Sequence, residues 1–339
     1  MSFLSGNNPH HRDYNWLFSL SNQVKSCLAG PVWTLKNVLN NFLIYAVAYG
    51  NGVFVVSGRN KTTNVSECYW TADLGNTFNI CVGLPASAAV TYTEIVFNGT
   101  YFFVCISSAT PVYYSLDGKT FNVNLSLINN LHMTSVANNY AFQLDVNGDG
   151  SPLAYGYTNG VVYQVRGNIL PASIGYNCFA AYFKGLYVIV GENGACYSNS
   201  IDGPWTAANV PAPQWTTQTG ADAGIATDGN ILIVASLSGA NYSRYYYTLN
   251  GVDWNISALP LTNTGNQSDV QYLQKTFFIM NRGRNVLYTS PDGLTFTQSA
   301  NLLPAAPFGG WKIASNGKGD FLAVSGYAND PSSIAYGKC

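Results

Sequence analysis

Few side chains of this 339-residue chain could act as an acid, a base or a nucleophile. Charged residues make up only 9% of the sequence. Glutamate occurs only at Glu67, Glu94 and Glu192, and histidine only at His10, His11 and His132. A Ser-His-Asp arrangement would have to use His132, in a segment leading into a predicted strand, or the histidines near the N-terminus. We therefore predict that the protein is not an enzyme and needs no cofactor.

The arginines are distributed unevenly along the chain. Four of the six fall in predicted loops, at Arg59, Arg244, Arg282 and Arg284. In a chain with so few charges, a basic rim of this kind could hold a carboxylate, a phosphate or an acidic partner. Together with Glu192, these arginines are the candidate ligand-binding residues. The alternative is that charged side chains collect in surface loops of any protein.

One segment has part of a metal-binding pattern. Asp145-Val-Asn147-Gly-Asp149-Gly matches the first half of a calcium-binding loop. The match then fails, because Leu153 and Gly156 stand where acidic ligands would be needed. We therefore predict no metal site, and Asp145, Asn147 and Asp149 remain only a calcium alternative to an ordinary polar turn.

A repeated pair of strands must position these side chains. Each pair is an apolar run, a tight turn and a second apolar run, and the turns fall at Asn51-Gly52, Asn98-Gly99, Asn138-Asn139, Lys184-Gly185, Asp228-Gly229, Gln274-Lys275 and Asn316-Gly317. Asn-Gly between β-branched and aromatic runs is a strong hairpin signal, because both turn residues accept positive φ. The second turn residues are 47, 40, 46, 44, 46 and 42 apart. A period in the forties is typical of one four-stranded propeller blade.

A second hairpin follows these strand pairs and has its own signature, Ser/Thr-x-Asp/Asn-Gly followed by an aromatic residue. The copies are centred on Asp73, Asp117, Asn159, Asp202, Asn250 and Asp292. Only the copy from Thr71 to Phe78 has the full Ser/Thr-x-Asp-x-Gly-x-Thr-aromatic spacing. These hairpins resemble the Asp-box, or BNR, repeat of sialidases and related propellers.

The residues of this box have a structural explanation. The Asp or Asn side chain closes the turn onto backbone amides, glycine takes the strained φ, and the aromatic ring is buried under the hairpin. The resemblance implies that the box lies on the face opposite the ligand site. A sialidase also needs an arginine triad and a Tyr/Glu nucleophile pair, and its usual arginine-containing N-terminal motif is absent here. The resemblance to sialidases is therefore one of scaffold.

The last repeat lacks its outer strand, because the chain stops at Cys339 before a fourth strand can form. The missing strand is predicted near the N-terminus, where residues 30–38 (Gly-Pro-Val-Trp-Thr-Leu-Lys-Asn-Val) are similar to residues 203–210 (Gly-Pro-Trp-Thr-Ala-Ala-Asn-Val). An N-terminal strand in this place would close the ring and remove its exposed edges. It would put Trp33 beside the strand ending at Tyr336, and Cys27 near Cys339.

The predicted fold is therefore all-β. It is a seven-bladed β-propeller of four-stranded antiparallel blades over residues 30–339, closed by an N-terminal strand and preceded by an arm of residues 1–29. Asn8-Pro9 is a plausible helix start in this arm, and apolar residues follow at helical spacing at Trp16, Leu17, Leu20, Val24 and Leu28. The predicted amphipathic helix is either a lid on the propeller's own surface or a peg for a larger assembly. In the second case Trp16, Leu17, Leu20 and Val24 are the partner-docking residues.

Composition narrows the possible functions. A net charge of −1 gives no electrostatic footprint for nucleic acid or an anionic membrane. No stretch has the length of a transmembrane helix, and the N-terminus does not read as a signal peptide. The seven cysteines show no metal-binding spacing. Cys105 and Cys178 are expected as buried thiols in inner strands, and Cys68 and Cys81 could face each other across a hairpin, reduced in the absence of a secretion signal.

The sequence thus predicts a non-catalytic structural or binding module of a larger assembly. Low charge and many Asn, Ser, Thr and Tyr residues resemble a bacteriophage virion component, such as a tail, fibre or capsid decoration, made in the host cytoplasm. The expected partners are protein subunits of that particle, and a surface glycan is a further candidate. We expect no binding to nucleic acid and no insertion into a membrane. The alternatives are a carbohydrate-binding propeller, whose Tyr and Trp rings stack on sugars, a sialidase-like glycoside hydrolase, and an organellar or photosynthetic assembly factor.

Overall fold

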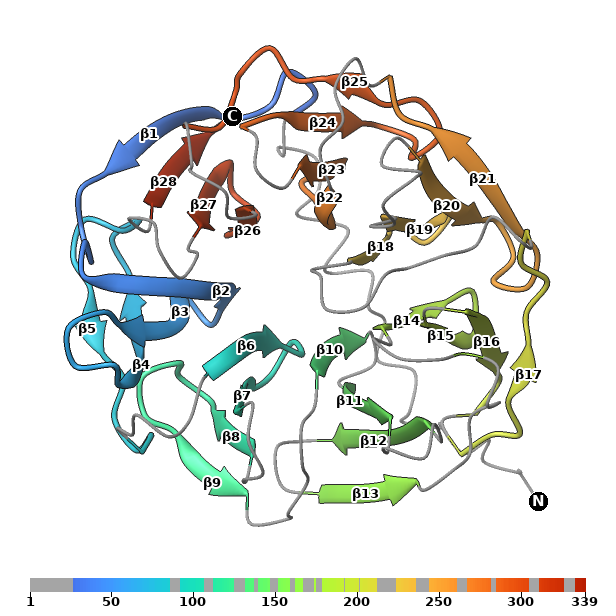
Figure 1. Cartoon of the computed structure of the whole chain (residues 1–339), viewed down its shortest axis with the longest axis horizontal. Coiled ribbons are helices and arrows are strands. Elements are labelled where there is room, and N and C mark those ends of the chain that lie inside the picture. The colour runs from blue at the N-terminus through green and yellow to red at the C-terminus, as the bar shows by residue number, and fades with distance from the viewer. Residues whose placement is uncertain are drawn as a thin grey trace, which may run out of the picture.

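The computed structural model describes residues 27–85, 92–106, 112–124, 132–136, 140–146, 152–158, 162–166, 174, 179–191, 193–200, 202–211, 224–235, 244–260, 267–281, 285–304, 311–325 and 333–339. Within these ranges the strands form seven four-stranded antiparallel sheets, arranged as blades around a common axis (Figure 1). The innermost strand of each blade contacts that of the next, all round the ring and back to the first. The fold is therefore a closed β-propeller, as the repeat predicted.

Blades are numbered in chain order, with strands given from the axis outward. Blade 1 contains β2 (Phe42–Gly50), β3 (Val53–Asn60), β4 (Ser66–Thr71) and β5 (Asn79–Ile80), and blade 2 contains β6 (Tyr92–Phe97), β7 (Phe102–Ile106), β8 (Val112–Ser115) and β9 (Asn122–Asn124). Blade 3 contains β10 (His132–Val136), β11 (Tyr140–Val146), β12 (Pro152–Thr158) and β13 (Val162–Arg166), and blade 4 contains β14 (Phe179–Phe183), β15 (Leu186–Gly191), β16 (Gly194–Ser198) and β17 (Thr206–Ala207).

The remaining blades complete the ring. Blade 5 contains β18 (Ile225–Thr227), β19 (Leu232–Ala235), β20 (Arg244–Thr248) and β21 (Trp254–Ala258), and blade 6 contains β22 (Gln267–Leu273), β23 (Thr276–Asn281), β24 (Leu287–Ser290) and β25 (Thr297–Gln298). Blade 7 contains β26 (Trp311–Ser315), β27 (Asp320–Ser325), β28 (Ser333–Lys338) and, outermost, β1 (Val32–Lys36).

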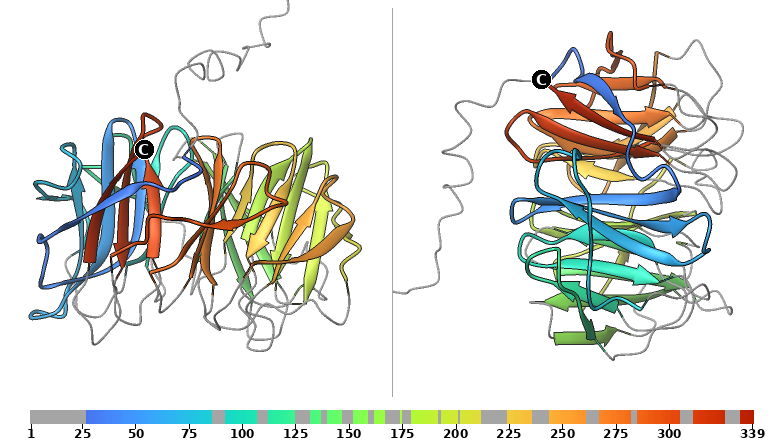
Figure 2. Two further views of the ribbon diagram at one scale, coloured as in Figure 1. Left: turned by 90° about the horizontal axis from the view of Figure 1, so that it is seen from above. Right: turned by 90° about the vertical axis from the view of Figure 1, so that its left-hand side faces the viewer.

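The two faces of the ring are made by different connections, because each blade is an antiparallel meander (Figure 2). One face of the ring, here named the box face, carries the inner turns, such as Asn51-Gly52, and the box turns. The Asn51 amide group donates to the Leu116 carbonyl of the next box at 2.6 Å, and the Lys184 ammonium group donates to the Leu249 carbonyl at 2.8 Å. The opposite face, here named the loop face, carries the connection from the second strand of each blade to the third.

The hydrophobic core lies in the seams between neighbouring blades. Val55 of blade 1 packs with Phe102 of blade 2 in one buried cluster, and Ile233 of blade 5 packs with Phe277 of blade 6 in another. The second strands are apolar on both sides, since each is covered by the blades before and after it. Trp311, which is fully buried, belongs to the cluster between blades 6 and 7.

Ring closure follows the sequence prediction. Strand β1 pairs antiparallel with β28, with Trp33 opposite Gly337 and Thr34 opposite Tyr336. The Trp33 ring packs edge-on against Phe321 at a centroid distance of 6.3 Å. A strand from the N-terminus therefore covers the edge that the C-terminus leaves.

The cysteines were only partly anticipated. Cys27 and Cys339 form a disulfide, with their Cα atoms 5.6 Å apart, where the sequence predicted proximity and left the bridge open. Cys68 and Cys81 are neighbours, because the Cys81 amide donates to the Cys68 carbonyl at 2.8 Å. Both are buried cysteines outside any disulfide, as is Cys196. Cys105 lies on β7, as expected, and Cys178 falls outside the described residues.

The predicted N-terminal helix, with Trp16, Leu17, Leu20 and Val24, also lies outside the described residues. Leu28 was expected to end its apolar stripe, but it lies in a turn in which the Gly30 amide donates to the Cys27 carbonyl at 2.8 Å. No α-helix occurs in the part of the chain that the structure describes. That part accordingly contains no helix with the length and hydropathy of a membrane span.

Candidate functional site

The loop face of blade 1 is the best described part of the predicted ligand site. Arg59 was placed in a loop by the sequence, but it lies within β3, paired with Leu43 and Ser66. Its Nε donates to the Asn64 carbonyl at 3.0 Å, so the guanidinium group braces the connection between β3 and β4. The Asn60 side chain accepts hydrogen bonds from two further amides of this connection. Arg59 is thus a loop-face residue held in a fixed position.

Two tyrosines of blade 1, Tyr45 and Tyr69, have raised pKa values. Burial raises the pKa of Tyr45, and the positive charge of Arg59 opposes that rise. The Tyr69 hydroxyl donates to Glu67 Oε2 at 2.7 Å, and burial together with this hydrogen bond raises the pKa of Tyr69. Both phenols are therefore neutral hydrogen-bonding groups at neutral pH. They can recognise polar groups, and Glu67 already has a partner.

The innermost strands of three blades contain a β-bulge near their loop-face ends. The register shifts between Ile44 and Ala46 in β2, between Tyr92 and Glu94 in β6, and between Gln267 and Asp269 in β22. A bulge bends its strand and re-aims side chains, and bulges are common at barrel rims and beside binding sites. The repeat pattern in the sequence did not predict these bulges. One available signal was Gly58 opposite the first bulge, where any Cβ would collide with the Leu43 carbonyl.

Asp269, which directly follows the third bulge, is a buried carboxylate that was not among the predicted site residues. It is only 4% exposed. One oxygen accepts from the Val270 amide at 2.8 Å, and the other accepts from the Gln271 side chain at 3.0 Å. Gly224 of blade 5 lies so close that a Cβ there would strike this carboxylate. An aspartate in an otherwise apolar inner strand was the signal that could have revealed it.

The other candidate ligand residues are not brought together by the described structure. Arg244 was also expected in a loop, but it is the first residue of β20, paired with Ala258. Arg282, Arg284 and Glu192 lie outside the described residues, as do His10 and His11. His132 begins β10, where the sequence placed it at the entry of an inner strand.

The calcium alternative gains no support. Asp145 lies within β11, paired with Leu153, where the pattern required the start of a loop. Asn147 and Asp149 are outside the described residues. No cluster of three potential metal-ligating side chains occurs among the residues that the structure does describe.

The box carboxylates are engaged in closing their own turns. Asp117 accepts from the Ser115 hydroxyl at 2.9 Å and from the Lys119 and Thr120 amides at 2.8 Å. Asp292 has the same three kinds of donor, as does the Asn250 side-chain oxygen. The hydroxyl that donates to the carboxylate also accepts from the box glycine amide. Asn159 is outside the described residues. Asp202 lies in a turn, and its backbone amide donates to the Ser200 hydroxyl.

These hydrogen bonds stabilise the ionised carboxylates. Hydrogen bonds from the Thr77 hydroxyl, the Thr77 backbone amide and the Thr71 hydroxyl lower the pKa of Asp73 to about 2. Partial burial raises the pKa of Asp117, but its backbone and Ser115 hydrogen bonds outweigh that effect and hold the pKa below the ordinary value. A carboxylate with a lowered folded-state pKa contributes stability above the unfolded-state pKa of about 3.9 and loses it as the pH falls through the folded-state value. For Asp73 the window runs from about pH 4 to about pH 2.

Replacing a box aspartate should therefore reduce stability. We expect Asp73→Ala and Asp117→Ala each to lower the free energy of unfolding at pH 7 by about 1 to 2 kcal/mol, since several turn hydrogen bonds are lost. Urea titrations at pH 7 and at low pH would measure the effect, and the deficit should shrink in acid. Asn255→Ala, at an exposed position of β21, is the control. A variant as stable as wild type at pH 7 would contradict the structural role.

Comparison with known proteins supports the fold. No family model and no curated protein matches the chain. Among solved structures, YCF48 bound to a D1 peptide is 15% identical, with a TM-score of 0.61 over 90% of this chain and 96% of that one. A catalytically inactive virginiamycin B lyase from Staphylococcus aureus, bound to quinupristin, is 11% identical, with a TM-score of 0.66 over 91% and 99%. BamB from Moraxella catarrhalis is 12% identical, with a TM-score of 0.51 over 87% and 85%. At these identities the likeness shows the propeller fold alone.

Proposed function

We propose that this protein is a non-catalytic structural and binding module of a larger assembly, docked through its N-terminal arm. A bacteriophage virion component, such as a tail, fibre or capsid decoration, is the assembly that we infer from the composition. Its partners are protein subunits of the same particle. The loop face, with Arg59 and Arg244, is then available for an acidic partner.

The firm attachment of the arm's base is the observation that carries this proposal. Cys27 is bonded covalently to Cys339, and the following residues are tied to blade 6 by side-chain hydrogen bonds. An arm that only needed to lie near the propeller would not require such an anchorage. An arm that attaches the propeller to another subunit does require it, because any force on the arm is transmitted to the propeller through these residues.

The use of the described carboxylates is consistent with a scaffold. Asp73, Asp117 and Asp292 close box turns. Asp320 accepts from the Tyr336 hydroxyl at 2.6 Å and from the Asn316 side chain at 2.8 Å. Burial, together with the Asp320 hydrogen bond, raises the pKa of Tyr336 to about 12. These groups already have intramolecular partners, which supports a structural role for them.

The similar structures illustrate two uses of this fold. YCF48 is a propeller seen with a bound peptide, which supports peptide or protein binding as a use open to this chain. Virginiamycin B lyase is named as an enzyme, so the fold by itself does not separate a binding module from a catalyst. We favour the binding module because Asp73, Asp117, Asp292 and Asp320 serve the scaffold.

Substitutions in the arm test the proposal. Trp16 and Leu20 lie on one predicted helical face, and burying such side chains contributes about 25 cal/mol per Å² of apolar surface. We expect the double variant Trp16→Ser, Leu20→Ser to keep the propeller's melting temperature and to lose incorporation into the particle. Incorporation would be measured by mass spectrometry of purified particles.

The matched control is Asn15→Ser, Asn22→Ser, on the opposite side of the predicted helix, which should assemble normally. If the Trp16, Leu20 variant assembles as well as wild type, the anchor is refuted. A variant that assembles normally while the protein binds a glycan array would instead favour the carbohydrate-binding alternative.

A further inference from the structure

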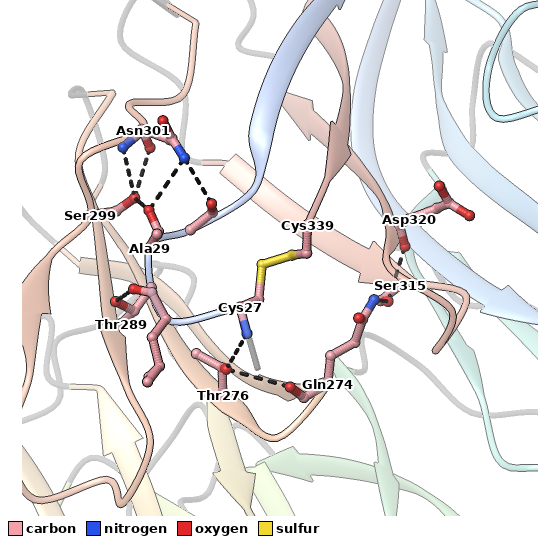
Figure 3. Close-up of a disulfide and its surroundings, with 12 residues drawn as sticks. Cys27, Ala29, Gln274, Thr276, Thr289, Ser299, Asn301, Ser315, Asp320 and Cys339 are labelled. Carbon is pink, nitrogen blue, oxygen red and sulfur yellow. Dashed lines mark hydrogen bonds between the residues drawn. A yellow bond between two sulfur atoms is a disulfide. The ribbon is translucent and has the colours of Figure 1, made fainter. Parts of the chain in front are cut away.

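The base of the N-terminal arm is joined to two blades at once (Figure 3). On the blade 6 side, Thr276 Oγ1 accepts from the Cys27 amide at 3.2 Å, and Thr289 Oγ1 donates to the Leu28 carbonyl at 2.7 Å. Ser299 Oγ donates to the Ala29 carbonyl at 2.9 Å. On the blade 7 side, the only covalent tie in the described residues is the bond between Cys27 and Cys339.

The disulfide lies at the N-terminal end of β1. A pull on the arm would begin to separate β1 from β28 at this same end. Val32, the first residue of β1, pairs with Lys338, the last residue of β28. Without the disulfide, a force on the arm would therefore break the β1–β28 hydrogen bonds one pair at a time, starting from this end. The disulfide joins residues just beyond that first pair, so the force reaches the covalent bond before it reaches the strands.

The two cysteine residues differ in their exposure to solvent. Cys27 is buried, at 3% exposure, whereas Cys339 is exposed. A dithiol reductant can attack the Cys339 sulfur, which releases the Cys27 thiolate and forms a mixed disulfide with Cys339. The second thiol of the reductant then displaces Cys339. The two electrons come from the reductant, which leaves as a disulfide, and both cysteines become thiols.

We propose that Cys27–Cys339 is a reversible redox lock on ring closure. In the oxidised protein, β1 and the arm base are fixed to the closed ring. In the reduced protein, β1 and the arm base separate from β28 and rejoin it, held only by hydrogen bonds and side-chain packing. The lock acts on the last blade and leaves the other six blades unchanged.

The timing of locking rests on the proposed function. A subunit made in a reducing cytoplasm would assemble with the lock open, because cytosolic dithiols keep such cysteines reduced. Release of the particle into an oxidising medium would then close the lock. The arm would be free to adjust during assembly and held firmly afterwards.

Hydrogen–deuterium exchange of the full chain tests the lock. Oxidised protein would be compared with protein treated with dithiothreitol, a small dithiol. We expect reduction to speed amide exchange in Val32–Lys36 and Ser333–Lys338 by about tenfold or more, because opening becomes easier. Over exchange times shorter than global unfolding, exchange in the buried strand Phe102–Ile106 of blade 2 should stay the same. The variant Cys27→Ser, Cys339→Ser should exchange at the reduced rate without reductant and should not respond to it.

Cys196→Ala, which removes a buried cysteine that is not part of a disulfide, is the matched control and should keep the difference between oxidised and reduced protein. Should the double serine variant fail to fold, reduced wild-type protein supplies the same comparison. Equal exchange rates in fully reduced and oxidised protein would overturn the lock. So would a peptide map, made without reductant, in which Cys27 and Cys339 are not linked. The arm variant Trp16→Ser, Leu20→Ser should keep the redox response even if the proposed docking is wrong, which separates the two ideas.

Discussion

Deletion of residues 1–38 should leave an open ring that melts at a much lower temperature and self-associates. The deletion removes β1, exposes the edge of β28, and takes the Trp33 ring away from Phe321. It also removes the disulfide, which spans 312 residues of sequence. Such a long loop constrains the unfolded chain by about 5 kcal/mol or more, a large part of the total stability of about 5 to 15 kcal/mol typical of a domain. An unpaired strand edge also invites pairing with another molecule.

Calorimetry and light scattering coupled to size exclusion would measure both effects. Deletion of residues 1–26 is the matched control, because it removes most of the arm and keeps Cys27 and β1. That shorter deletion should melt close to wild type and remain monomeric. If the longer deletion also does so, β1 is not needed to close the ring.

The repeated hairpins could be predicted because their signals are local. Asn51 and Gly52 both have positive φ, at 45° and 86°, and β2 and β3 pair directly across them. The box is equally local, since Asp117 accepts hydrogen bonds from Ser115, Lys119 and Thr120, all within three positions of itself. A turn defined by its own few residues leaves its pattern in the sequence.

Closure by β1 is a long-range pairing, and it was predictable for a different reason. The segment from Gly30 resembles the segment from Gly203, which leads into β17, the outermost strand of blade 4. Internal similarity thus identified β1 as an outermost strand, and the incomplete last repeat identified its blade. No local propensity could have given that assignment, because the partners Val32 and Lys338 lie at opposite ends of the chain.

The remaining features depend on contacts that leave no repeated pattern. The contact of Cys27 with Thr276 joins residues 249 positions apart and occurs once. The three bulges shift the register of innermost strands without a common residue type, since the residues that follow them are Ala46, Glu94 and Asp269. The candidate site combines such strand ends with connections of varied length, so the sequence could suggest Arg59 and could not describe its surroundings.

Substitution of a box glycine should be much more damaging than substitution of an inner-turn glycine. Gly293 has a φ of +72°, and an added Cβ would lie 2.5 Å from Ile233 Cδ1 and 3.1 Å from Phe277 Cε2. Both neighbours are fully buried in the seam between blades 5 and 6, so neither can turn aside freely. We expect Gly293→Ala to lower the free energy of unfolding by about 2 to 4 kcal/mol, the sum of a left-handed backbone cost and an overpacking cost.

Gly229→Ala isolates the backbone cost. Gly229 has a φ of +89°, and an added Cβ would have nothing within 4 Å. This variant should lose only about 1 to 2 kcal/mol, because it suffers left-handed strain without a clash. Urea titrations of both variants give the difference. Equal losses would mean that the seam tolerates the extra methyl group, and that the box glycine is required for its turn alone. A larger loss at Gly293 would show that each box also fixes the spacing between neighbouring blades, so that a local turn motif contributes directly to the packing of the whole ring.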